Sequence, residues 1–380
     1  MTEWTDAHLD LAYLAVAGRD VLTACPDPAQ GCISIPDLRD GSIGLIFGTI
    51  FIEPGKPDEP GGYADSDDIE GAERAGLRQI QVYEDLERTG HISIVRTRRD
   101  LDHLPTPPSV REGVGGWVED VDRSRRPTHP LAPSLKGRGN APIKVVILME
   151  GADPIRSPEH VKEWFERGVR IVGLTWAMGS RYAGGNAKPG PLTGAGREMI
   201  AALDELGIVH DLSHLSDPAV DELLSITRGR IIASHSNARS LMADEPAQAI
   251  PGVSAGLERH LPDAYIHDVS KRGGVVGLNL FSKFLIGGRR VAAGQRATIE
   301  DCIRHVEHIA QVMGHRRGVG LGSDADGGFL PIMLPEGLDH PRKWVGLLDG
   351  LSRAGWSKED VDGFARGNWL RFLHEALPNG

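Results

Sequence analysis

Two side chains that can bind metal ions stand in an apolar run near the start of the chain. His8 and Asp10 lie two positions apart in "TDAHLDLAY", residues 5–13. Successive side chains of a β-strand point to opposite faces, so residues two apart share a face. A lone buried polar group would need a partner, whereas an imidazole and a carboxylate together can share a cation such as Zn²⁺. The spacing therefore predicts a metal site that begins at this strand.

Four more side chains of the same kinds stand at or near the ends of other apolar runs. They are Glu150 in "IKVVILME", His214 in "GIVHDLSH", His235 in "RIIASHS" and Asp324 in "GVGLGSD". Any one of them alone is more often a structural residue or a helix cap, but six such side chains form a pattern. Glu150 has two oxygens and could bridge two ions. Water held between ions roughly 3.5–4 Å apart becomes hydroxide near neutral pH.

The elements that must position these residues are predicted from eight apolar runs. The runs are continuous rather than alternating, as expected of parallel strands that are buried on both faces. They cover 5–13, 42–51, 143–150, 169–176, 207–214, 230–236, 273–281 and 318–324. Amphipathic helices are predicted between them, at 68–89, at 195–206, from the cap Asp217 onward, and at 298–313.

The alternation of strands and helices predicts a (β/α)8 TIM barrel of the metal-dependent hydrolase type, with its chemistry at the carboxyl ends of the strands. A doubly wound open sheet is the alternative, but no dinucleotide-type glycine loop follows the first strand. The helix at 298–313 has the clearest ends. Thr298 with Asp301 forms a capping signal, Cys302 falls on its apolar stripe, and Gly314 ends it.

We expect a single barrel domain over residues 1–380 with an irregular insertion at about 103–140. The insertion is rich in proline, glycine and basic residues and is too long for a bare connection. A disordered excursion, a lid and an oligomer contact are all compatible with it. Trp117 and Val118 favour a lid or a contact, because they give the segment something to bury.

The charge and composition narrow the classes of partner. A net charge of -11 argues against nucleic acid or an anionic membrane. No apolar run reaches the length of a membrane span, and no signal peptide is recognisable. Three sparse cysteines do not make a disulfide framework, although a Cys25–Cys32 bridge is an alternative. We therefore expect a cytoplasmic protein that acts on a small molecule.

Several stretches resemble the membrane dipeptidase (renal dipeptidase) family of the amidohydrolase superfamily, over nearly the whole chain. They include "TDAHLDL", "LMEGADPI", "VHDLSHLSDPAVDELL", "IIASHSNARSL" and "GVGLGSDADG". The resemblance implies a barrel with two Zn²⁺ ions per chain, and it suggests a homodimer. His8 and Asp10 would hold one ion and His214 and His235 the other, with Glu150 between them. Asp324 would carry a proton from the bridging water to the leaving amine.

Three positions depart from the family pattern where substrate is expected. The family's Gly-Gly-His after the bridging Glu is Gly151, Ala152 and Asp153; its Thr-His is Thr175 and Trp176; and its Pro-Arg-Asn stretch reads "DEPAQ", residues 244–248, without an Arg. Asp153 could receive a cationic substrate group or cap a helix before Pro154. Arg181 or Arg239 could replace the missing Arg. We predict substrate contacts from Asp153, Trp176 and Arg239.

The function predicted from the sequence is that of a zinc-dependent dipeptidase-type hydrolase. It would cleave an amide bond of a dipeptide or related N-acyl amino acid with a metal-bridging hydroxide, and Glu150 and Asp324 would be its catalytic residues. The departures favour one alternative, in which the metal-binding barrel has altered non-peptidase chemistry or a binding role in a biosynthetic pathway.

Overall fold

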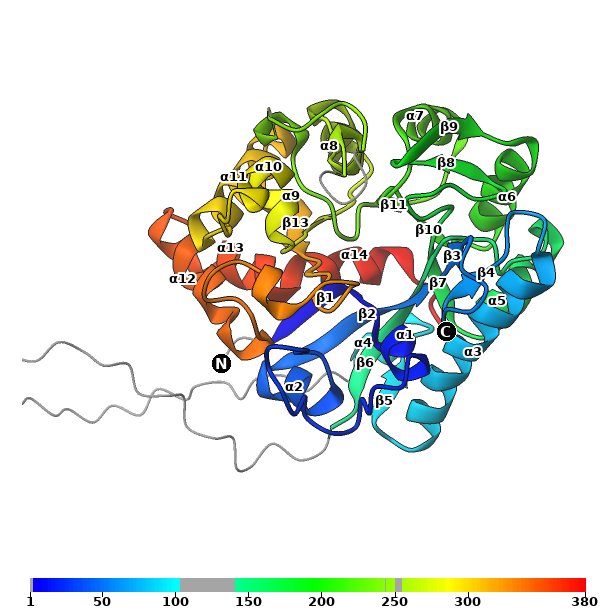
Figure 1. Ribbon diagram of the computed structural model, residues 1–380, viewed down its shortest axis with the longest axis horizontal. Helices are drawn as coiled ribbons and strands as arrows, with labels where there is room; N and C mark the ends of the chain where they lie inside the picture. Colours follow the sequence, from blue (N-terminus) through cyan, green and yellow to red (C-terminus); the bar gives the residue numbers. More distant parts are fainter. Residues whose placement is uncertain (1–2, 103–140, 243, 250–254) are drawn as a thin grey trace, which may run out of the picture.

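A computed structural model describes residues 3–102, 141–242, 244–249 and 255–380. Its centre is a nearly closed (β/α)8 barrel of parallel strands with helices around it (Figure 1). This confirms the fold predicted from the apolar runs. The insertion predicted at 103–140, with Trp117 and Val118, lies outside the described residues.

The eight barrel strands follow one another around the ring in chain order. They are β1 (Trp4–Leu9), β2 (Ile43–Phe51), β6 (Ile143–Glu150), β7 (Val169–Gly173), β10 (Val209–Asp211), β11 (Ile231–Ile232), β12 (Val276–Leu278) and β13 (Val319–Leu321). β1 pairs with β13, and a parallel bridge between Ala233 and Val276 joins β11 to β12. Because parallel strands share a direction, their carboxyl ends meet at one mouth of the barrel.

All eight predicted runs contain a barrel strand, but several strands are shorter than the runs. The strands in 207–214 and 230–236 end before the histidines, which lie in the turns that follow. The sequence analysis missed β5 (Ile92–Ile94), a ninth strand that pairs with the start of β6. Two small sheets lie outside the ring: β3 (Glu53–Pro54) with β4 (Gly62–Tyr63), and β8 (Ala183–Gly185) with β9 (Lys188–Leu192).

Fourteen α-helices are present in the described ranges, and none of them is long and apolar enough to cross a membrane. They are α1 (Leu11–Val16), α2 (Ile35–Asp40), α3 (Ile69–Arg88), α4 (Arg98–Asp102), α5 (Val161–Glu166), α6 (Gly194–Glu205), α7 (Asp217–Ile226), α8 (Asp263–Lys271), α9 (Ser282–Ile286), α10 (Gly288–Ala292), α11 (Ile299–Met313), α12 (Val345–Arg353), α13 (Lys358–Asp362) and α14 (Asn368–Ala376).

The predicted helix ends are confirmed for α11 and corrected for α7. Thr298 and Asp301 form a reciprocal capping box, and Gly314 ends α11 in the left-handed conformation. The cap of α7 is Ser216, and Asp217 is the first helical residue. The prediction of Asp217 as the cap was wrong because its carboxylate binds the guanidinium of Arg239 instead of backbone N–H groups.

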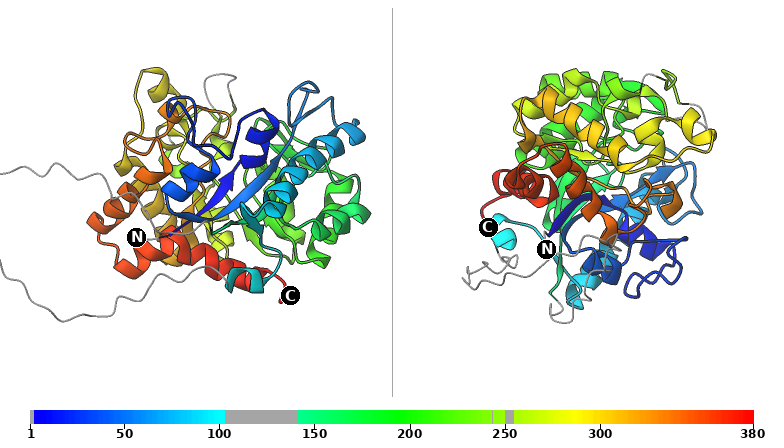
Figure 2. Two further views of the ribbon diagram at one scale, coloured as in Figure 1. Left: turned by 90° about the horizontal axis from the view of Figure 1, so that it is seen from below. Right: turned by 90° about the vertical axis from the view of Figure 1, so that its left-hand side faces the viewer.

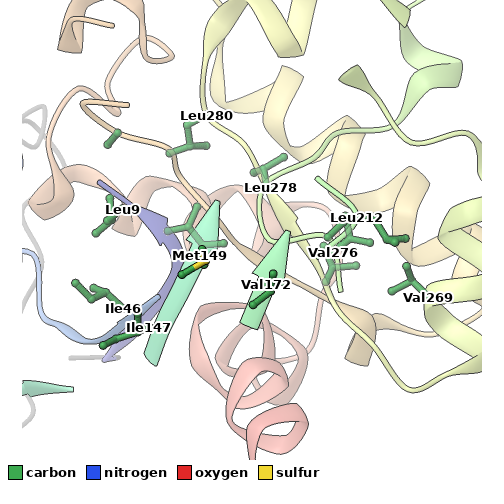
Figure 3. Packing of buried hydrophobic residues seen from close by; sticks show 14 of the residues in the cluster. Leu9, Ile46, Ile147, Met149, Val172, Leu212, Val269, Val276, Leu278 and Leu280 are labelled. Atoms are coloured by element: carbon green, nitrogen blue, oxygen red, sulfur yellow. The ribbon is translucent and has the colours of Figure 1, made fainter. Parts of the chain in front are cut away.

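Two apolar clusters hold the barrel together. The larger one joins strands to the surrounding helices, and Figure 3 shows part of it, including Ile147, Val172 and Val276 on strands and Val269 on α8. Cys302 belongs to this cluster and is fully buried, as its place on the apolar stripe predicts. Complete burial of one such aliphatic side chain stabilises the fold by about 1.5–3 kcal/mol.

The second cluster joins six of the barrel strands to the C-terminal helix. Leu45, Leu148 and Ile171 pack there with Trp369 and Phe372 of α14. Figure 2 shows α14, in red, running along the bottom of the molecule in its left view. Leu45, Leu148 and Ile171 precede the ends of their strands, whereas Glu150 is the last residue of β6. The apolar contacts with α14 thus leave the carboxyl-end mouth to the polar residues.

We expect Thr298→Ala to lower the free energy of unfolding by about 1 kcal/mol, because the first turn of α11 loses its capping oxygen. Denaturant unfolding followed by circular dichroism measures the change. Ser225→Ala is the matched control: its exposed hydroxyl donates to Glu222 within α7, so its removal should cost less than about 0.5 kcal/mol. Equal effects in the two variants would contradict a stabilising cap.

Candidate metal centre

The structure gathers the six predicted side chains around Glu150. Its Oε1 lies 3.2 Å from His214 Nε2 and 3.4 Å from His235 Nε2. Its other oxygen, Oε2, lies 3.5 Å from His8 Nε2. One carboxylate therefore faces three imidazole nitrogens that come from different strand ends, all within the buried mouth of the barrel.

Asp10 and Asp324 lie beside His8 on the other side of the cluster. Ligand atoms of the three residues lie within 4.8 Å of one another, as do those of His8, Glu150 and His235. His8 is common to both groups. The hydroxyl of Thr49 donates to Asp10, and Asn279 Nδ2 donates to Asp324 Oδ2 at 2.9 Å. These bonds fix one oxygen of each carboxylate and leave the other for a ligand.

Backbone strain marks two of the site residues. Among the described residues, four non-glycine residues have positive φ, and His214 (69°) and Asp324 (60°) are two of them. The left-handed conformation costs roughly 1–2 kcal/mol for an L-residue. Strain of this kind persists where the surrounding structure holds it, and it concentrates at functional sites. Both residues follow short strands whose positions are fixed by pairing, so the turn alone absorbs the strain.

The electrostatics of the cluster call for a cation. Burial raises the pKa of Asp10 to about 6 and that of Asp324 to about 7. Burial by itself would lower the pKa of His8, but the neighbouring carboxylates of Glu150 and Asp10 raise it to about 10. Without a metal, the protein therefore offsets part of its buried negative charge with a proton on His8. A metal ion takes over that role when its ligands lose their protons.

The donor set fits a pair of transition-metal ions. Glu150 Oε1 is buried, and no described residue donates a hydrogen bond to it. His214 Nε2 and His235 Nε2 are 3.0 Å apart, where two ring nitrogens of a tetrahedral zinc site would be roughly 3.3 Å apart. Imidazole and carboxylate ligands suit zinc and its neighbours in the first transition row. The six residues could hold one ion on each side of Glu150.

Two of the residues predicted to meet substrate have partners within the chain. Asp153 is almost fully buried and accepts hydrogen bonds from the Tyr63 hydroxyl and from Arg181, whose Nε lies 3.0 Å from Oδ1. The alternative that Asp153 caps a helix is wrong, because residues 151–155 form bends and turns. Arg239 donates two bonds to Asp217, at 2.6 and 2.7 Å. Substrate roles for Asp153 and Arg239 stay predictions.

Trp176, the third predicted substrate residue, lies beside the metal cluster. Its ring centroid is 6.0 Å from that of His214 and 5.3 Å from that of Phe51. Phe51 in turn meets Tyr13 edge to face at 5.4 Å. All three aromatic side chains are partly exposed, so they form one aromatic wall (Tyr13, Phe51 and Trp176) that reaches the metal ligands.

The sequence analysis missed a cation at the site. Arg259 is 3% exposed and donates to His235 O at 2.9 Å and to Ser236 Oγ at 3.1 Å. Its positive charge acts on the carboxylates of Asp324 and Glu150. The family pattern places an Arg at 244–248, whereas Arg259 lies farther along the chain, just before α8. No spacing in the sequence marks Arg259, because its place beside His235 depends on the fold.

His210 is a structural residue of the barrel wall and no ligand of the metal cluster. It shares the strand parity of His214, but its Nε2 lies 2.7 Å from Asp204 Oδ1. Asp204 also accepts hydrogen bonds from Thr227 and Arg228, which tie α6 to the turn after α7. The bond from this histidine therefore stabilises the barrel wall.

Comparison with known proteins identifies the family. The sequence pattern of the family described as Membrane dipeptidase (Peptidase family M19) matches residues 134–378. The chain belongs to this family. Its members are metallopeptidases, so membership implies a bound metal and a hydrolase acting on small peptides.

Full-length relatives and solved structures agree with this assignment. The chain is 26% identical over 356 residues to the dipeptidase aclJ of Aspergillus oryzae, covering 91% of this chain and 70% of that one. It is 28% identical over 380 residues to an uncharacterised dipeptidase of Schizosaccharomyces pombe, covering 96% and 78%. A metallopeptidase of Rhodobacter sphaeroides, solved with a phosphinate mimic of L-Ala-D-Ala, shares the fold with a TM-score of 0.74 at 20% identity, covering 98% and 99%.

We expect Arg181→Met to lower the free energy of unfolding by about 3 kcal/mol, because it leaves the buried Asp153 carboxylate without its cation. The double variant Arg181→Met with Asp153→Asn should recover most of the loss. Arg156→Met is the matched control: its side chain is 40% exposed and pairs with two surface carboxylates, so it should cost at most about 1 kcal/mol. If denaturant unfolding gives Arg181→Met the same free energy of unfolding as the wild-type protein, burial of the Asp153 carboxylate does not depend on this ion pair.

Proposed function

We propose that the protein is a zinc-dependent dipeptidase that hydrolyses the amide bond of a dipeptide or a related N-acyl amino acid. The observation that carries the proposal is the Glu150 carboxylate, held within 3.2–3.5 Å of the Nε2 atoms of three histidines. A buried carboxylate can be stable without three neighbouring imidazoles and without an oxygen that lacks a hydrogen-bond donor. A carboxylate that bridges two metal ions requires both features.

The ligands divide into two sets. His8 and Asp10 would hold one ion, His214 and His235 the other, and Glu150 would contact both. Bound together, the ions would supply an acidified water as nucleophile and would polarise the scissile carbonyl. Asp324 lies among these ligands, and burial raises the pKa of its carboxyl to about 7. A group with this pKa can accept a proton from water and deliver it to the leaving amine near neutral pH.

The substrate would lie between a cation and the aromatic wall. Arg259 supplies a fixed positive charge beside His235, which suits the terminal carboxylate of a dipeptide. Trp176 presents a partly exposed ring next to His214, where the side chain of a bound residue could pack. The phosphinate mimic of L-Ala-D-Ala bound by the Rhodobacter sphaeroides relative supports a small dipeptide as ligand.

The competing function is a metal-containing barrel with non-peptidase chemistry or a binding role. It is favoured by Asp153, because the family has a histidine at this position that helps to polarise the substrate carbonyl. Asp153 is bound by Arg181 and Tyr63 and cannot donate a hydrogen bond to an oxyanion while it is ionised. A panel of L,L- and L,D-dipeptides and N-acyl amino acids, tested with zinc-loaded protein, separates the two functions. Tight binding of a substrate analogue without turnover of any panel member would favour the second.

We also propose a cellular compartment and an oligomeric state for the enzyme. All three cysteines are free, which supports a reducing compartment, the cytoplasm. A homodimer is carried over from the family resemblance. Light scattering of the purified protein measures its mass in solution directly.

We expect Asp324→Asn to keep two zinc ions per chain and to lower kcat by at least about 100-fold, because it removes the proton carrier. His214→Ala should lose at least one ion, since it removes a ligand. Metal content by elemental analysis and initial rates on the best dipeptide measure the two effects. If Asp324→Asn instead empties the site, Asp324 is a metal ligand and its proposed role is wrong.

A second prediction concerns the substrate carboxylate. Wild-type enzyme should prefer a dipeptide over its C-terminal amide, and Arg259→Met should lose about 30-fold of that preference in kcat/KM, because a charge-assisted bond of about 2 kcal/mol disappears. The ratio of the two substrates is insensitive to partial loss of folded enzyme. Arg239→Met is the matched comparison and should leave the ratio unchanged. A loss of preference in Arg239→Met alone would assign the carboxylate to Arg239.

A further inference from the structure

One buried hydroxyl contacts both stacked histidines of the metal centre. Ser234 Oγ lies 2.7 Å from Nδ1 of His235 and 3.4 Å from Nδ1 of His8. The two imidazole rings lie face to face, with centroids 3.5 Å apart and planes 28° apart. Their Nε2 atoms both point to Glu150, one to each of its oxygens. The rings therefore run in parallel from one hydroxyl to one carboxylate.

The proton balance at Ser234 fixes the tautomer of both rings. A neutral imidazole that offers Nε2 to a metal carries its proton on Nδ1. A hydroxyl oxygen can accept two hydrogen bonds and donate one. Ser234 can thus accept from both Nδ1–H groups only if its own proton goes elsewhere.

The carboxylate of Asp211 lies beside the Ser234 hydroxyl. It accepts hydrogen bonds from the backbone N–H groups of Ser234, at 2.9 Å, and of Ser213, at 3.0 Å, and the nearby Ser234 hydroxyl lowers the pKa of Asp211 against the effect of burial. Asp211 is 3% exposed and ends β10, while Ser234 follows β11, so paired strands hold the two groups in place. An ionised carboxylate can only accept, so its place beside Ser234 favours a hydroxyl that donates toward Asp211 and accepts from the histidines.

We propose that Ser234, oriented by Asp211, is a positioning residue that presets one histidine of each metal subsite, so that the binding of both ions depends on one hydroxyl. The inference rests on the two-ion site of the proposed function but on no particular substrate. The remaining metal histidine is positioned separately, since His214 Nδ1 lies 3.0 Å from Asn186 Oδ1. Loss of the Ser234 hydroxyl should therefore lower the metal affinity of both subsites, whereas loss of the Asn186 side chain should lower the affinity of one.

The test is a competitive titration of metal-free protein with Zn²⁺ and a chelator, repeated with Co²⁺ and followed by its visible absorption. Partners of metal-bound histidines are typically worth 10–100-fold in affinity. We expect Ser234→Ala to lower the affinity for both ions by about that factor. Asp211→Asn, which keeps the size of the side chain, should also lower both affinities.

Ser213→Ala is the matched control. It removes a neighbouring buried hydroxyl that contacts Ser234 and Ser236 and accepts a hydrogen bond from the backbone N–H of His235, but contacts no imidazole Nδ1. Its melting temperature without metal should fall about as much as that of Ser234→Ala, while both ions bind with affinities within about threefold of wild type. A purely structural role for Ser234 would lower the melting temperature and leave metal affinity unchanged.

The outcomes separate this inference from the proposed function. If wild-type protein binds two ions and Ser234→Ala binds both equally well, or has a lower affinity for only one, the proposed shared role of Ser234 is wrong and the proposed function stands. If Ser234→Ala does not fold, Asp211→Asn decides in the same way. If wild-type protein binds no transition metal, both proposals fall.

Discussion

Three carboxylates are held away from water at the mouth of the barrel, and the arrangement around them compensates their charge. Asp10, Glu150 and Asp324 are each less than a tenth exposed. Burying an unpaired carboxylate is far more costly than burying an apolar group, so such a cluster persists only with cations or protons nearby. Arg259 and the proton on His8 offset part of the charge in the protein alone. In the proposed function, a pair of divalent cations would offset the rest.

The barrel satisfies this constraint by placing apolar and polar residues at opposite ends of its strands. Apolar residues pack against α14 at one end, where Trp369 also donates a hydrogen bond to Leu321 O. Polar residues occupy the strand ends at the other. Parallel pairing brings Glu150 level with Phe51 and Gly173, and Asp211 level with Ile232. Because these ends are aligned by backbone hydrogen bonds, ligands far apart in the sequence reach one point, and strained turns at His214 and Asp324 are held in place.

Two charged residues predicted to meet substrate are paired within the chain. The negative charge of Asp153 is neutralised by Arg181, and that of Asp217 by Arg239. Arg259 lies beside the metal ligands and donates a hydrogen bond to the backbone oxygen of His235. The family membership and the aromatic wall are thus compatible with a dipeptide-sized ligand whose carbonyl is activated chiefly by metal ions rather than by a side chain at position 153.

The sequence by itself determined the barrel, the metal ligands as candidates and the capped helix α11. These depend on local properties: continuous apolar runs mark buried parallel strands, and Thr298, Asp301 and Gly314 satisfy helix ends within a few residues. Only the tertiary structure decided the charge pairs, because an ion pair depends on where two distant backbones bring their side chains. Arg259, Asp217 with Arg239, and the hydroxyl of Ser234 between two histidines therefore carried no signal in spacing alone. The short strand β5 was missed for the same reason, since it is defined by its pairing with β6.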